Sequence, residues 1–156
     1  MNRPPTIRVQ AEDFDIRVEI SSLTDGHSDI GAVACFTGLC RDERGTLDAL
    51  ELEHYPGMAE AEMRRIAEKA AGRWPLDGIT VIHRYGKIRP GENIVLVVTA
   101  SKHRQAAFAS ASFLMDFLKS SAPFWKREIL KDGGEGAWVD ARVCDVDALK
   151  RWDRES

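Results

Sequence analysis

The fold is most constrained by one stretch in the second half of the chain, where a buried strand leads directly into an apolar helix. Ile94–Ala100 is an almost unbroken apolar run, which is typical of a central strand. Ser101 is the predicted N-cap of an alanine-rich helix that ends near Lys119 or Ser120. Pro123 then forces a break. Such a pair of segments indicates a sheet that is covered by helices.

The other segments alternate between strand-like and helix-like patterns. Met58–Trp74 carries apolar residues at steps of three and four, which predicts a second long helix that Pro75 ends. Gly31–Cys40 is expected to be a buried strand, and Leu47–His54 is a plausible partner for it. The remaining predicted strands are Thr6–Gln10, Ile79–Tyr85, Phe124–Leu130 and Ala137–Val143, and short helices are expected at Phe14–Leu23 and Asp145–Trp152.

This order of segments predicts an α+β fold with a mixed, largely antiparallel β-sheet and two main helices on one face. The 156 residues are expected to form one domain, residues 1–156. No run of about eighteen apolar residues occurs, so no membrane span is expected. The N-terminus lacks the apolar region of a secretory signal, which makes the cytoplasm the expected compartment. The net charge of -3 argues against a general nucleic-acid-binding protein.

The three cysteines do not form a disulfide or metal-binding framework. Cys35 and Cys40 lie in one predicted strand at an odd spacing, so they face opposite sides of it. Cys144 stands alone, and the four histidines show no HExxH or paired Cys/His spacing. We therefore expect no metal site and no bound cofactor.

The clearest functional signal is a local excess of cations. Between Lys102 and Lys131 the chain has six Lys or Arg residues but only two acids, Asp116 and Glu128. These cations lie next to apolar and aromatic residues such as Phe124 and Trp125. Cations beside apolar surface suit an anionic small molecule or a carboxylate tail.

His103 and Arg104 lie at the start of the predicted helix that follows Ser101. The N-terminus of a helix already favours an anion, so cationic side chains in its first turn depart from the usual preference for acids. A departure from a local rule can mark a functional site. Two solvated surface residues explain the pattern equally well.

Lys119 and Lys126 lie on either side of the break at Pro123. A lysine at the C-terminus of a helix is ordinary, because it complements the helix dipole. Strand alternation places Phe124, Lys126 and Glu128 on one face, with Trp125 and Arg127 on the other. If Lys126 points into a pocket near Lys119, each cation favours the neutral form of the other, and such a lysine can both donate and accept a proton.

Three further residues have a simple structural interpretation beside a functional one. Arg41 follows a strand, which is a common place for a functional side chain, although a lone arginine there is usually only solvated. Phe36 and Met115 are most simply core residues. Met115 could also form the wall of a pocket.

Four blocks of the chain match one known family in order and spacing. The blocks are Phe36–Arg41, Leu52–Glu60, Val81–Arg84 together with Gly86, and the region from Ser101–Arg104 through Ala122–Glu128. They resemble the large, catalytic subunit of molybdopterin synthase, the MoaE family, and the similarity covers roughly residues 31–152.

The resemblance implies a reaction, a fold and a set of partners. The family converts cyclic pyranopterin monophosphate to molybdopterin by installing two sulfurs. The sulfur arrives as a thiocarboxylate on the C-terminal Gly-Gly of a small ubiquitin-like subunit, whose tail enters a pocket of the large subunit. Two large subunits form a central homodimer within a heterotetramer. The implied fold is of the α/β hammerhead type.

The resemblance also implies roles for individual residues. Lys119 and Lys126 become the catalytic pair, with Lys119 holding the tail and moving protons while Lys126 stabilises charge on the pterin. The positions implied in substrate binding are Leu39, Cys40, Arg41, His103, Arg104, Lys119, Lys126, Arg127 and Glu128, and those lining the pocket are Phe36 and Met115. His103 and Arg104 are expected to come from the opposite large subunit.

The chain departs from the family at two positions, and two other functions remain open. The family often has a basic residue at the position of Leu39 and valine at that of Cys40. If the side chain at position 39 matters, substrate contact there is weakened. One alternative function is a non-catalytic module that binds the C-terminal tail of a ubiquitin-like partner. The other is an enzyme that forms a Schiff base between a lysine and a carbonyl substrate.

Overall fold

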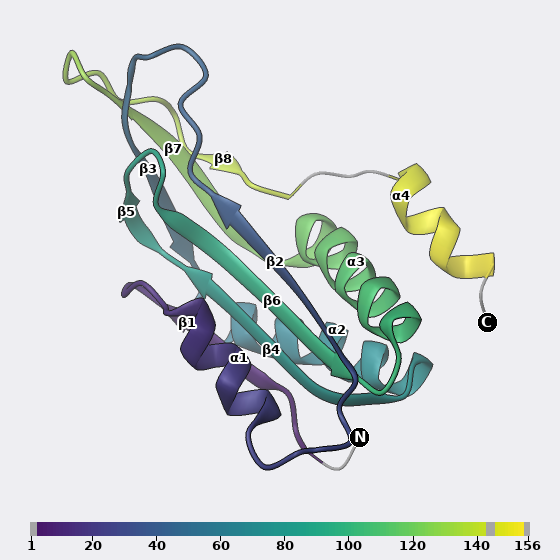
Figure 1. The fold of residues 1–156 in the computed structure, drawn as a ribbon. Helices are drawn as coiled ribbons and strands as arrows, with labels where there is room; N and C mark the ends of the chain where they lie inside the picture. Colours follow the sequence, from purple (N-terminus) through teal and green to yellow (C-terminus); the bar gives the residue numbers. More distant parts are fainter. Residues whose placement is uncertain (1–2, 143–145, 155–156) are drawn as a thin grey trace.

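The computed structural model describes residues 3–142 and 146–154 and contains two four-stranded sheets with helices packed on the first (Figure 1). The strand order is β1-β4-β6-β2 in the first sheet and β5-β3-β7-β8 in the second. In chain order the elements are β1 (Thr6–Gln10), α1 (Ile16–Thr24), β2 (Ala32–Leu39), β3 (Leu47–His54), α2 (Met58–Arg73), β4 (Leu76–Arg84), β5 (Gly86–Ile88), β6 (Asn93–Ser101), α3 (Arg104–Ser121), β7 (Phe124–Leu130), β8 (Val139–Asp140), α4 (Val146–Lys150) and a 3-10 turn at Arg151–Arg154.

The apolar run of the sequence forms the centre of the first sheet, as predicted. β6 lies between β4 and β2 and is antiparallel to both. β1 adds to the outer edge of β4 in a parallel pairing. The sheets are therefore mixed and largely antiparallel, and the predicted α+β class is confirmed.

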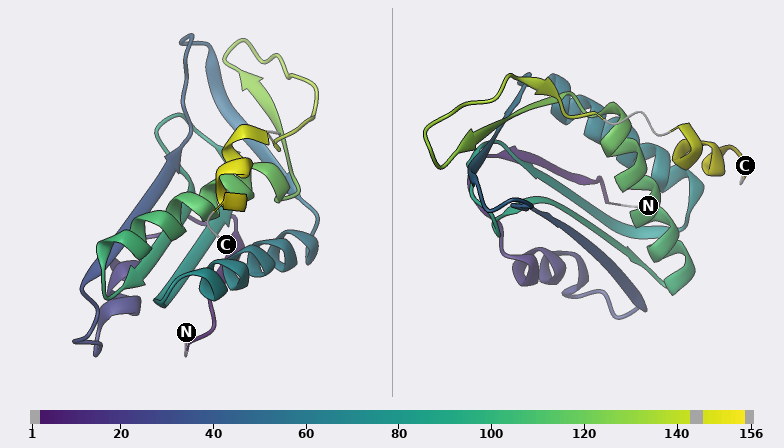
Figure 2. Two further views of the ribbon diagram at one scale, coloured as in Figure 1. Left: turned by 90° about the vertical axis from the view of Figure 1, so that its right-hand side faces the viewer. Right: turned by 90° about the horizontal axis from the view of Figure 1, so that it is seen from above.

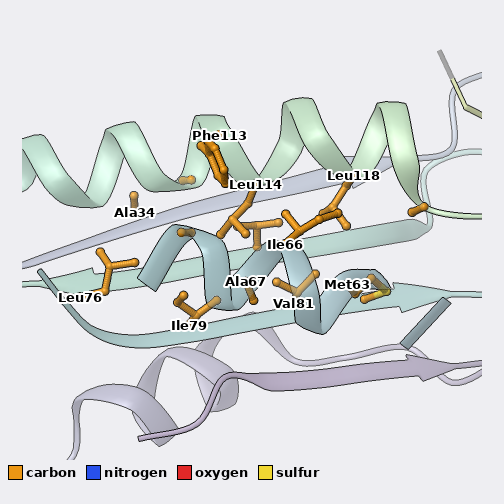
Figure 3. Close-up of a cluster of buried hydrophobic side chains, with 14 of the residues drawn as sticks. Ala34, Met63, Ile66, Ala67, Leu76, Ile79, Val81, Phe113, Leu114 and Leu118 are labelled. Atoms are coloured by element: carbon orange, nitrogen blue, oxygen red, sulfur yellow. The ribbon is translucent and has the colours of Figure 1, made fainter. Parts of the chain in front are cut away.

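Helices cover both faces of the first sheet. α2 and α3 pack together on one face, where Ile66 and Leu114 meet Val81 and other strand residues (Figure 3). On the opposite face α1 packs Leu23 against Ile82 and its neighbours. Figure 2 shows the sheet between these two layers. The two main helices share one face as expected, whereas the short helix α1 covers the opposite face.

The second sheet corrects the predicted strand pairing. β3 pairs with β5 and β7, not with β2, although β2 precedes it in the chain. Residues 40–46 carry the chain from one sheet to the other. Pairing with β7 places Leu52 opposite Lys126. This register brings the cationic strand to the seam between the two sheets.

The predicted buried strand is instead an edge strand. β2 has β6 on one side only, and many of its side chains are exposed, with Phe36 43% and Leu39 54% accessible. The predicted strand Ala137–Val143 is reduced to the two residues of β8, and Val143 lies outside the described residues. β2 is exposed because no further described strand pairs with its outer edge, and β8 is short because only Val139 and Asp140 pair with β7.

The start of α3 is two residues later than expected. Ser101 is the last residue of β6, and its hydroxyl donates to the carbonyl of Pro75 at 2.8 Å. The N-cap is His103, whose side chain makes no capping hydrogen bond. Ser101 therefore links the end of β6 to the connection between α2 and β4, and it does not cap α3.

α3 is fixed to the central strand along its apolar face. Phe113 and Leu114 are fully buried. The Thr99 hydroxyl of β6 donates to the Ala107 carbonyl of α3 at 2.7 Å, in a buried position. The packing therefore fixes α3 along the first sheet.

No helix in the described part of the chain is long and apolar enough to cross a lipid bilayer.

Met63→Ala should lower the free energy of unfolding by about 2–5 kcal/mol, because the fully buried Met63 of α2 would leave a cavity against the sheet. Met58→Ala on the same helix is the matched control, since Met58 is 57% exposed, and its effect should stay within about 0.5 kcal/mol. Urea unfolding of both variants measures the difference. Equal effects would contradict the packing described for α2.

Candidate active site

A pocket opens at the seam between the two sheets, next to the C-terminal end of α3. Its walls come from strands of both sheets, from the last turns of the helix and from the residue after β8. The lining residues are Phe36, Gly38, Leu39, Leu50, Leu52, His83, Ile94, Val95, Met115, Leu118, Lys119, Ala122, Phe124, Lys126 and Ala141.

The pocket brings together five of the residues that the sequence singled out. Phe36 and Leu39 come from β2, Met115 and Lys119 from α3, and Lys126 from β7. Leu118, next to Lys119, is buried in the core that α3 shares with the first sheet. The predicted convergence of the two lysines on one pocket is thus present in the structure.

A short joint between helix and strand sets the two lysines at the same cavity. The Ala122 N–H donates to the Leu118 carbonyl and ends α3, and the Phe124 N–H donates to the Ala122 carbonyl at the start of β7. Phe124 and Lys126 both line the pocket, two residues apart in a strand. The predicted alternation of β7 is followed here.

The pocket is cationic within an apolar wall. Its only side chains with nitrogen or oxygen atoms, among the described residues, are His83, Lys119 and Lys126. No carboxylate lines it in the part of the chain that the structure describes. Uncompensated positive charge beside apolar surface attracts an anion more strongly than the same charge in open water.

Three other predicted substrate-binding residues lie outside this pocket. Cys40 is buried in a separate cluster with Ile88 and other apolar residues. Arg41 is exposed and forms an ion pair with Glu43. Glu128 is exposed further along β7 and does not line the pocket.

Arg127 faces away from the pocket, as the alternation of β7 requires. Its guanidinium contacts Glu51 at 3.0 Å and Glu135 at 3.1 Å, and it lies 4.6 Å from the ring centroid of Trp138. Two carboxylates and an indole therefore occupy the group that was expected to bind substrate. In this geometry Arg127 supports the second sheet.

His103 and Arg104 lie at the opposite end of α3 from Lys119. Fifteen residues of helix separate Arg104 from Lys119, which corresponds to about 22 Å at 1.5 Å per residue. Both residues are exposed at the start of the helix. They cannot reach the pocket of their own chain.

His83 is a pocket residue that the sequence reasoning missed. Its ring stacks on Phe124 with centroids 3.7 Å apart and an interplanar angle of 16°. Its Nδ1 lies 2.8 Å from the Arg84 carbonyl oxygen. The signal was available, because His83 continues by steps of two the face of β4 that carries the buried Ile79 and Val81.

Burial lowers the pKa of His83 from 6.5 to about 4. The positive charge of Lys119 and the nearby His54 lower the pKa further, while the hydrogen bond to Arg84 opposes the shift. His83 is therefore neutral at physiological pH. Among the described residues, no group of three or more His, Cys, Asp or Glu side chains could hold a metal ion.

Comparison with known proteins gives consistent matches. The family model described as MoaE protein matches residues 9–121. The molybdopterin synthase catalytic subunit of Mesorhizobium japonicum (strain LMG 29417 / CECT 9101 / MAFF 303099) is 66% identical over 152 residues, covering 97% of this chain and 96% of the relative.

Solved structures share the fold. Molybdopterin cofactor biosynthesis protein E from Burkholderia multivorans ATCC 17616 aligns with a TM-score of 0.85 at 48% identity, covering 99% of this chain and 100% of that one. A complex of subunit 1 and 2 of molybdopterin-converting factor from Helicobacter pylori 26695 aligns with a TM-score of 0.71 at 18% identity. That alignment covers 88% of this chain and 91% of the other.

Acidification should destabilise the fold through His83. Between pH 6.5 and about 4 the unfolded chain binds a proton at this residue and the folded chain does not, so the free energy of unfolding falls as the pH falls. The contribution is about 3 kcal/mol across that window. Urea unfolding at several pH values should show that His83→Asn loses this part of the pH dependence.

His27→Asn is the control, because His27 is exposed. It should keep the pH dependence of the unchanged chain. A parallel loss in both variants, or no loss in His83→Asn, would contradict the neutral state of His83.

Proposed function

Because the chain belongs to the MoaE family, we propose that it is the catalytic subunit of a molybdopterin synthase. In this role it converts cyclic pyranopterin monophosphate to molybdopterin by transferring two sulfurs from a thiocarboxylated partner. The family match covers residues 9–121 of the chain, which include β2, β6 and Lys119 of the pocket.

The observation that carries this proposal is the pairing of Lys119 and Lys126 in an apolar pocket without a lining carboxylate among the described residues. A thiocarboxylate is an anion, and so is the carboxylate that remains after sulfur transfer. Ammonium groups bind such groups by charge-assisted hydrogen bonds. An apolar wall strengthens that attraction, because it lowers the local dielectric constant.

The partner we propose is a small ubiquitin-like subunit whose C-terminal Gly-Gly thiocarboxylate enters the pocket. Glycines have no side chains, so such a tail can pass between the apolar walls formed by Phe36, Leu39 and Met115. The relatives' name, catalytic subunit, implies further subunits in those proteins. The Helicobacter pylori protein with this fold is a complex of two subunits.

Lys119 and Lys126 take different roles in this proposal. Lys119 holds the tail carboxylate and transfers protons as sulfur is delivered. Lys126, which projects from β7 on the opposite side of the Ala122–Pro123 joint, stabilises charge on the pterin. Arg41 is exposed two residues beyond Leu39, and it can bind the substrate phosphate once its ion pair with Glu43 opens.

A second copy of the chain supplies His103 and Arg104. These residues lie too far along α3 to serve their own pocket, and both are exposed at the surface, where a second molecule can reach them. We propose a homodimer of large subunits, each completing the substrate site of the other, within a heterotetramer. The phosphate of the substrate is the group they bind.

Lys119→Ala should abolish formation of a product with two sulfurs while the fold stays intact, because the exposed end of this side chain contributes little to packing. The assay combines the chain with thiocarboxylated small subunit and cyclic pyranopterin monophosphate, and mass spectrometry detects the product. Lys87→Ala, in the exposed middle of β5, is the matched control and should keep full turnover.

Three results would contradict the proposal. No product from the unchanged chain, with the partner still bound, would favour the non-catalytic tail-binding module. Borohydride trapping of substrate on Lys119 would favour the Schiff-base enzyme. A melting temperature that falls strongly in Lys119→Ala would make the lysine a structural residue.

Mixing two inactive variants tests the shared site. Lys119→Ala and Arg104→Ala dimers should each be nearly inactive, but subunit exchange should restore activity, because a mixed dimer contains one pocket with both residues intact. Random exchange gives mixed dimers for about half of the molecules and one working site in each, so about a quarter of the full turnover is expected. Activity that does not recover after exchange would place Arg104 outside the partner's site.

A further inference from the structure

We propose that the neutral imidazole of His83 positions Lys119 in the pocket by accepting a hydrogen bond from its ammonium group. This inference deepens the proposed function and rests on it for its kinetic consequence. The proposed hydrogen bond involves two residues of this chain that line the same pocket, and it is not formed in the structure. Neither the sequence blocks nor the cation cluster assigned a role to His83.

The orientation of the His83 ring is fixed from two sides. The ring stacks on Phe124, and its Nδ1 lies 2.8 Å from the Arg84 carbonyl oxygen. A carbonyl oxygen only accepts hydrogen bonds, so Nδ1 carries the proton. In the neutral ring, Nε2 is then the unprotonated nitrogen and can only accept.

The backbone that receives this hydrogen bond is itself held in place. The buried Arg84 guanidinium donates to the carbonyl of Ala11 through Nε and Nη2, and to the carbonyl of Asn93 through Nη1. It therefore connects the residue after β1 with the end of β4 and the start of β6. This bracing makes the tautomer of His83 a fixed property of the fold.

Nε2 remains open to the pocket. It has no hydrogen-bond partner among the described residues. It is also not one of the fully buried, unpaired side-chain atoms of the described chain, which are Arg8 Nε and Asp77 Oδ2, so it is accessible. A histidine that served only to fill the core would need the stack and the Nδ1 bond but no accessible Nε2. A role in packing alone therefore does not explain why Nε2 of His83 is accessible.

His83 is the only side-chain hydrogen-bond acceptor among the described lining residues, apart from the weakly accepting thioether of Met115. The side-chain donors are Lys119 and Lys126. Lys119 is the one whose charge lowers the pKa of His83, together with that of His54, whose ring lies 6.0 Å from that of Phe124.

The surroundings keep His83 an acceptor throughout the physiological range. The groups that face it are Lys119, His54, Phe124 and the Arg84 carbonyl, and none of them is a carboxylate. Burial and the Lys119 charge hold its pKa at about 4. A protonated ring would repel the lysine, so the arrangement works only in the neutral form.

His83→Phe keeps the stack on Phe124 but removes the acceptor. We expect kcat to fall about tenfold or more, since hydrogen bonds to charged groups are worth at least that factor. KM for the pterin should change little. His83→Gln, whose amide oxygen lies near the position of Nε2, should recover part of the loss, whereas a purely structural role would not favour glutamine over phenylalanine.

His54→Phe is the matched control. His54 belongs to the same aromatic cluster, with its ring 6.0 Å from that of Phe124, but it does not line the pocket. It should keep kcat within about twofold of the unchanged chain. A kcat for His83→Phe within the same limits, or a variant His83→Gln no better than His83→Phe, would overturn the proposal.

A second measurement does not depend on turnover. In the chain labelled with nitrogen-15 histidine, the Nε2 resonance of His83 reports whether that nitrogen accepts a hydrogen bond. It should shift in Lys119→Met and stay unchanged in Lys126→Met, either in the chain alone or after addition of the small subunit in its carboxylate form. An Nε2 resonance unaffected by Lys119→Met in both samples would overturn the proposal, even if the chain makes molybdopterin.

Discussion

The burial of α3 against β6 and β2 is the interaction on which the rest of the structure depends. Fully buried side chains such as Phe113 and Leu114 each contribute about 1.5–3 kcal/mol on transfer from water. The hydrogen bond from Thr99 to Ala107 fixes the helix along the central strand. With the helix held in this way, its last turn ends at the seam between the sheets, and Lys119 lies at the pocket there.

The seam supplies the physical environment that the lysines need. Lys119 and Lys126 are both exposed, but they line a pocket with apolar walls. An anion that binds there loses part of its contact with water, so the two charges attract it more strongly than they would on an open surface. His83 adds a neutral hydrogen-bond acceptor of fixed orientation. The pocket therefore contains two ammonium groups and one imidazole that does not offset their positive charge.

The sequence predicted the elements better than their neighbours in space. Strand and helix patterns are local, so β6, α2 and β7 were predicted nearly to the residue. The pairing of β3 with β7 was not, because it joins segments far apart in the chain. Lys119 and Lys126 were identified through family blocks. Their shared pocket, the carboxylates that hold Arg127 and the stacked His83 depend on contacts that no local pattern contains.

The joint at Ala122 and Pro123 limits how this chain can change in length. It connects a helix, with a period of 3.6 residues, to a strand, with a period of two. Loss or gain of one residue here would exchange the two faces of β7 and put the position of Lys126 where Arg127 now meets Glu51. This joint therefore does not tolerate deletions or insertions, whereas the mostly exposed loop of residues 41–46 has room for both.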